Sequence, residues 1–139
     1  MVRALESRLQ CVYMLFLDYA YALFEGFLGK MYMQMVVRGK PTLPVTTSLI
    51  VKNLGVFIIN LPFAGKKAEA HLNQAIALER EMGANHLLGL ACLDLAILHK
   101  ARKRRSKARE CLSEAITLFE QCEAEAFLQQ AKEELASLK

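Results

Sequence analysis

The sequence predicts an all-α fold, a solenoid of about six or seven antiparallel helices. Apolar residues recur at helical spacing along most of the chain, and strand-like alternation is nearly absent. A 40-residue internal repeat fills the second half of the sequence. With 139 residues, 54% of them hydrophobic and 23% charged, the chain can bury a core and is too apolar to be disordered. These numbers favour a single domain spanning 1–139.

The first 38 residues contain no proline and predict one apolar helix or a helix pair. Between 9 and 37, apolar residues lie on every side of the expected helix, which is typical of a helix buried in its own chain, by another copy or by a partner. Asp18, Glu25 and Lys30 interrupt the apolar run. We therefore expect a core helix, neither a transmembrane span nor a signal peptide, and no membrane association.

Glycine and proline divide the middle of the chain. The segment 39–45 predicts a loop, and Thr46 or Thr47 can cap a helix over 46–60. Pro62 suits the first turn of a further helix, because its missing N–H is harmless there. Gly83 is expected to end that helix in the left-handed conformation.

The remaining sequence, 62–139, predicts two repeats of 40 residues with a closing helix. Asn85 and Ser106 are expected to cap helices of about 86–102 and 107–121, and a last helix covers about 124–138. Residues 67–99 align without gaps on 107–139 and keep the same order of Ala and Leu across a turn. A fixed period of this length is typical of helical solenoids.

Small residues beside large ones mark close helix crossings, where Ala or Gly lets two backbones approach. Two patterns of this kind recur, namely Ala68-x3-Leu72-x2-Ala75 with Ala108-x3-Leu112-x2-Ala115, and Leu28-Gly29-x2-Tyr32 with Leu88-Gly89-x2-Cys92. They are the two halves of the tetratricopeptide signature, so the chain resembles a tetratricopeptide-repeat (TPR) protein with a right-handed stack. The spacing from Gly29 to Gly89 differs from the standard repeat and implies that 46–60 is an inserted helix.

Residues 20–139 look more specifically like the C-terminal repeat region of bacterial signalling proteins that join an adenylate or guanylate cyclase domain to an AAA ATPase domain. The stretches that carry this resemblance are Leu28-Gly29-Lys30-Met31-Tyr32-Met33-Gln34, Lys52-Asn53-Leu54-Gly55, Leu61-Pro62-Phe63-Ala64 and Phe119-Glu120-Gln121-Cys122-Glu123-Ala124-Glu125. The resemblance implies a cytoplasmic, non-enzymatic module for protein–protein interaction or sensing. It also implies that this chain is a fragment or remnant of a larger protein.

The same resemblance implies a binding face. In TPR stacks the first helix of each pair lines a concave surface, where a protein or peptide partner docks. Transferred onto this sequence, the pattern selects one set of residues in each of the two helices that carry Leu-Gly: Lys30, Met33 and Gln34, and His86, Leu90 and Asp94.

One charge feature stands out, a basic cluster between 100 and 109 that contains no acid. Its members are Lys100, Arg102, Lys103, Arg104, Arg105, Lys107 and Arg109. Three interpretations remain open: a solvated turn, a site for an acidic protein, or a nucleic-acid-binding accessory that works by counterion release. Without aromatic residues among the bases, stacking on nucleobases is not expected.

No motif in the sequence indicates an enzyme. None of the Gly-Lys pairs belongs to a phosphate-binding loop, and there is no G-x-S-x-G nucleophile elbow. The four cysteines lack zinc-ligand spacing and fall in apolar helical patterns, which is typical of reduced thiols in a cytoplasmic protein. We expect no catalytic residues, no metal and no cofactor. A further alternative is a regulatory fragment that forms a homodimer through 9–37.

Overall fold

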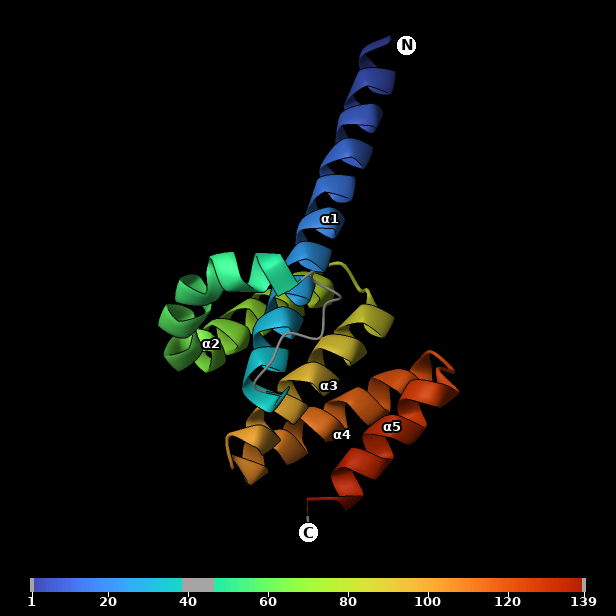
Figure 1. The fold of residues 1–139 in the computed structure, drawn as a ribbon. Coiled ribbons are helices and arrows are strands. Elements are labelled where there is room, and N and C mark those ends of the chain that lie inside the picture. The colour runs from blue at the N-terminus through green and yellow to red at the C-terminus, as the bar shows by residue number, and fades with distance from the viewer. Residues whose placement is uncertain (1, 39–46, 139) are drawn as a thin grey trace.

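The computed structural model describes the backbone of residues 2–38 and 47–138, and the side chains of residue 10, 12–37 and 63–138. In these segments the chain is all-α and contains no strand, as predicted. The expected loop 39–45 and the capping residue Thr46 lie outside the described residues. The five helices are α1 (Val2–Arg38), α2 (Thr47–Glu81), α3 (Asn85–Ala101), α4 (Arg105–Gln121) and α5 (Glu125–Ala136) (Figure 1).

Helix α1 is one helix of 37 residues, and its N-terminal half projects from the rest of the molecule (Figure 1). Every residue from 12 to 21 is exposed, including Phe16 at 64%. Burial begins at Ala22 and then recurs at helical spacing through Glu25, Gly29 and Met33. Among the described side chains of 9–37, the expected burial is therefore found only in the second half of α1, which packs against α2 and α3.

Helix α2 is continuous where the sequence predicts two helices, 46–60 and a second one from Pro62. Pro62 lies inside it, and the ribbon of α2 changes direction along its length (Figure 1). An internal proline removes one backbone hydrogen bond and bends a helix without always ending it. For this reason the described part of the chain has five helices rather than six or seven.

Three turns of identical form join α2 to α3, α3 to α4, and α4 to α5. Gly83, Lys103 and Glu123 occupy the same position in each turn, with φ of 67°, 59° and 53°. In each turn the following amide donates to the carbonyl oxygen five residues earlier, at 2.9, 2.8 and 3.0 Å. These are Schellman-type helix ends. Since the turns recur every 20 residues along the chain, a pair of helices recurs every 40, which is the period of the sequence repeat.

The turn geometry also corrects the predicted caps. The N-cap residues of α3 and α4 are Ala84 and Arg104, and neither makes a side-chain capping bond. Asn85 is instead the first residue of α3, and the Ser106 hydroxyl lies 3.5 Å from the Glu110 carboxylate. Each three-residue turn fixes where the next helix begins, so a side-chain cap is not needed to set that position.

Two glycines allow the closest helix contacts. A Cβ atom built on Gly29 would lie 2.7 Å from the Leu72 side chain, and one on Gly89 would lie 2.7 Å from the Phe119 ring. Leu72 and Phe119 are both fully buried. The structure therefore has a close helix crossing at each of the two Leu-Gly pairs, as predicted: between α1 and α2, and between α3 and α4.

Candidate functional site

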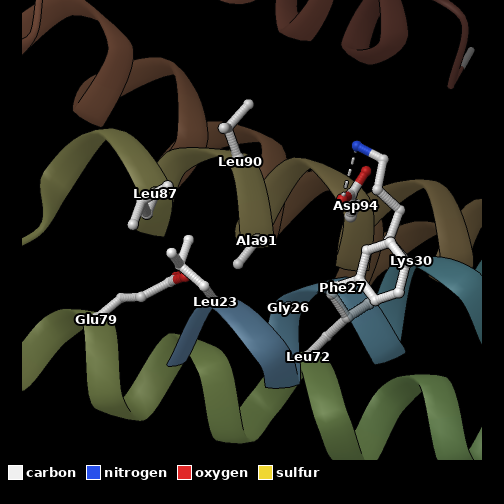
Figure 2. Close-up of a pocket in the computed structure, with 10 residues that line it drawn as sticks. All are labelled: Leu23, Gly26, Phe27, Lys30, Leu72, Glu79, Leu87, Leu90, Ala91 and Asp94. Atoms are coloured by element: carbon white, nitrogen blue, oxygen red, sulfur yellow. Dashed lines mark ion pairs between the residues drawn. The ribbon is translucent and has the colours of Figure 1, made fainter. Parts of the chain in front are cut away.

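A pocket with a volume of about 150 Å³ lies where α1, α2 and α3 meet (Figure 2). Helices α1 and α3 supply it with the same spacing of residues, at i, i+3, i+4 and i+7, which is one face of each helix. Helix α2 supplies two residues one heptad apart. The lining residues are Leu23, Gly26, Phe27 and Lys30 of α1, Leu72 and Glu79 of α2, and Leu87, Leu90, Ala91 and Asp94 of α3.

The pocket has a polar group at each end. At one end the Lys30 ammonium lies 3.3 Å from the Asp94 carboxylate (Figure 2). At the other end lies Glu79, close to Gly26. Glu79 approaches α1 at Gly26, four residues before Lys30, so the two ends are separated by about 6 Å along the helix. Between them the lining is apolar.

Exposure separates the floor of the pocket from its mouth. Leu72, Ala91 and Glu79 are buried, and they form the floor. Phe27 is 55% exposed and the Lys30 side chain is 50% exposed, so both lie at the mouth.

The structure brings together three of the six residues predicted for the concave face, namely Lys30, Leu90 and Asp94. The other three lie elsewhere. Met33 is buried in the hydrophobic core, and Gln34 is half-buried and does not line the pocket. His86 is exposed and packs edge-on against Phe127, with ring centroids 5.5 Å apart. The aromatic contact places His86 at the α4 and α5 side of α3, away from the pocket.

Sequence reasoning missed Glu79, although a signal was present. In the 40-residue repeat Glu79 aligns with Phe119, which is fully buried in the core of the second repeat. Glu79 is itself only 3% exposed, and its Oε2 has no hydrogen-bond partner among the residues that the structure describes. The equivalent position of the second repeat holds a buried apolar side chain. A carboxyl group at this position of the first repeat therefore indicates a role other than filling the core.

Burial raises the pKa of Glu79 to about 7. The other charged groups lining the pocket, Lys30 and Asp94, pair with each other at its far end. Burial also raises the pKa of Asp94, against the opposing effect of the Lys30 charge. The Cys92 thiol on α3 stays neutral, because burial and, to a smaller extent, the Glu114 charge raise its pKa to about 12.

We expect the Glu79→Gln variant to lose a pH dependence of stability. Between about pH 4.5 and 7 the folded protein holds a proton on Glu79 that the unfolded chain has released, so unfolding becomes easier as pH rises. After allowance for partial solvent screening, this amounts to about 1–2 kcal/mol. Urea unfolding at pH 4.5 and 8 should show Glu79→Gln as the more stable protein at pH 8 only.

Each comparison with wild type is made at the same pH, because His99 acts in the opposite direction. His99 is buried and burial lowers its pKa, so its contribution to stability is lost as pH falls below about 6.5. The difference between wild type and Glu79→Gln removes this background. An equal difference in stability at both pH values would contradict the assignment.

A second polar cluster joins α1 to α2. The buried Glu25 carboxylate lies 2.7 Å from Nδ1 of His71, whose ring stacks on Tyr32 with centroids 5.6 Å apart. The Lys67 ammonium lies over the Tyr32 ring, 5.4 Å from its centroid. A hydrogen bond to Glu25 raises the pKa of Tyr21. These contacts connect the two helices along the side of α1 and satisfy the buried carboxylate there.

The basic cluster is partly neutralised within the chain. Arg102 and Arg104 both bind the Glu69 carboxylate, at 2.5 and 3.0 Å. Lys100 lies 2.6 Å from the Glu134 carboxylate. These ion pairs therefore connect the end of α3 and the α3–α4 turn to α2 and α5.

Four other bases of the cluster are exposed, and none of them forms an ion pair within the described part of the chain: Lys103, Arg105, Lys107 and Arg109. A nucleic-acid surface would have fewer free cations here than the sequence indicates.

Comparisons of the chain with protein-family models, curated proteins and solved structures found no match.

Proposed function

We propose that this chain is a non-enzymatic interaction or sensory module of a bacterial signalling protein. Its helices would form a TPR-like right-handed stack, and a protein partner would bind the face that α1 and α3 share. The observation that supports this proposal is the pocket between these helices, which three of the residues selected for the concave face line.

The surroundings of the pocket favour a protein partner. Leu23 and Phe27 line the pocket from consecutive turns of α1 and are 41% and 55% exposed, and Lys30 follows Phe27 by one turn at the mouth. Apolar side chains with a charged rim are typical of the anchor regions of protein interfaces. Leu90 of α3 lines the same pocket, so two helices contribute to the proposed binding face.

The proposal predicts that Phe27→Ser abolishes partner binding while Phe63→Ser does not. The two phenylalanines are matched, at 55% and 56% exposure, but only Phe27 lines the pocket. Loss of an aromatic anchor costs about 2 kcal/mol or more, which weakens binding at least about 30-fold. The measurement is a pull-down with each variant, with and without nuclease and at low and high salt, followed by affinity measurement with the purified partner.

Helicity of each variant, from circular dichroism, controls for folding. Equal capture by wild type and Phe27→Ser would contradict the proposed face. Retention of nucleic acid alone, removed by salt, would instead favour the exposed bases of the α3–α4 turn.

The projecting half of α1 supports a second candidate function, self-association. Val12 to Leu17 are six consecutive apolar residues, each 43–64% exposed. The segment Val12–Val37 is long and apolar enough to cross a membrane by length and composition, but its second half packs against α2 and α3. The exposed residues 12–21 cover about 15 Å of α1.

Sedimentation of the purified chain over a range of concentrations tests this candidate. We expect an oligomer that dissociates in a variant with Leu15→Lys and Phe16→Lys. A wild-type monomer at every concentration would exclude self-association through this segment.

A further inference from the structure

We propose that the pocket between α1, α2 and α3 binds a primary ammonium group carried on a short apolar stem, with the ammonium at the Glu79 carboxylate. This inference rests on the proposed function in one respect, that the face shared by α1 and α3 is a binding surface. It adds to the proposed function the chemical class of the group that binds in the pocket.

The Glu79 carboxyl group requires a donor that the described part of the chain does not supply to it. Its Oε2 atom is buried without a hydrogen-bond partner, and Figure 2 shows the carboxyl end of Glu79 directed between α1 and α3, toward Leu23 and Leu87. A buried carboxylate is stable when it is both hydrogen-bonded and paired with a cation. An ammonium group supplies the charge and three N–H donors at one point.

The charges of the pocket select against the other ligand types. A carboxylate or phosphate would meet Glu79 at the buried end. Lys30, which could otherwise attract an anion, is paired with Asp94 at the other end of the pocket. Among the described lining residues, the only buried side-chain atom without a hydrogen-bond partner is Oε2 of Glu79, which is an acceptor once the carboxyl group is ionised.

The walls of the pocket select an apolar stem. Leu23, Phe27, Leu87 and Leu90 supply apolar side chains to the lining. An apolar cavity of about 150 Å³ is large enough for benzene, and a four-carbon chain is of similar bulk. n-Butylammonium reproduces a lysine side chain from Cβ to Nζ, so the same chemistry could come from a free amine or from a partner's lysine.

The test measures n-butylammonium binding at pH 8 and constant ionic strength, by calorimetry and by amide chemical shifts of the full chain. The matched probes are 1-butanol, which lacks the charge, and butanoate, which reverses it. We expect saturable binding of n-butylammonium, with the largest shifts at the pocket-lining residues, and binding of 1-butanol and butanoate at least about tenfold weaker.

Two substitutions in the same turn of α2 separate the pocket from general electrostatics. Glu79→Gln keeps the shape of the side chain and should weaken n-butylammonium binding at least about tenfold. Glu81→Gln removes the same charge from an exposed side chain outside the pocket and should leave binding unchanged. Equal binding by wild type and Glu79→Gln, equal binding of 1-butanol, or no saturable binding would each overturn the proposal.

A peptide arm distinguishes the two sources. A heptapeptide with a central lysine between leucines should bind more tightly than n-butylammonium if a partner's lysine is the ligand, and its norleucine analogue should not bind. Binding of n-butylammonium alone identifies a free amine.

The outcomes also separate this inference from the proposed function. A partner that is lost on Phe27→Ser, together with no binding of either probe, overturns only the ammonium site. Probe binding without any Phe27-dependent partner supports the ammonium site and contradicts the proposed function.

Discussion

Replacing Phe119 with alanine is expected to lower the free energy of unfolding by about 3–5 kcal/mol. Phe119 is fully buried on α4, where it stacks on Phe127 with ring centroids 5.6 Å apart and meets the bare backbone of Gly89. Alanine would leave a cavity between α3, α4 and α5 that these helices cannot close without losing their own contacts. Urea unfolding followed by circular dichroism measures the loss.

The Phe63→Ala variant is the control for the Phe119 experiment. Phe63 is 56% exposed on α2, so its truncation should change stability by no more than about 0.5 kcal/mol. A loss below about 1 kcal/mol for Phe119→Ala would mean that the helices of the second repeat do not pack through this ring.

Replacing Gly29 with alanine is expected to cost about 1–3 kcal/mol, although alanine is the better helix former. The new Cβ would lie 2.7 Å from Cγ of Leu72 and 3.0 Å from its backbone nitrogen. Neither atom is the free end of a flexible side chain, so α1 and α2 must move apart. Because Leu72 also forms part of the pocket floor, n-butylammonium binding should weaken in the same variant.

Gly65→Ala is the matched control for Gly29→Ala. Its Cβ would meet Arg102 at 3.5 Å, which is an ordinary contact, so the gain in helix propensity should raise stability by up to about 1 kcal/mol. Thermal and urea unfolding of the two variants should therefore shift in opposite directions. A shift in the same direction would show that the crossing at Gly29 is not as close as described.

The sequence by itself determined the parts of the fold that depend on local pattern. The spacing of Ala and Leu predicted helices, and Gly83 predicted the end of α2. The two Leu-Gly pairs predicted close crossings, and the structure has a bare glycine backbone against Leu72 and Phe119 there. All of these features depend on the side chain at one position or on neighbours within two helical turns, which is information that a linear sequence carries directly.

The tertiary structure alone decided the features that join residues distant in sequence. It paired Arg102 and Arg104 with Glu69, more than 30 positions earlier, and so reduced the free charge of the basic cluster. It left residues 12–21 without any covering helix. It also closed three helices around Glu79. Hydropathy read along one helix gives the period of a buried face but not which neighbour covers it, and the burial of a carboxyl group depends on that neighbour.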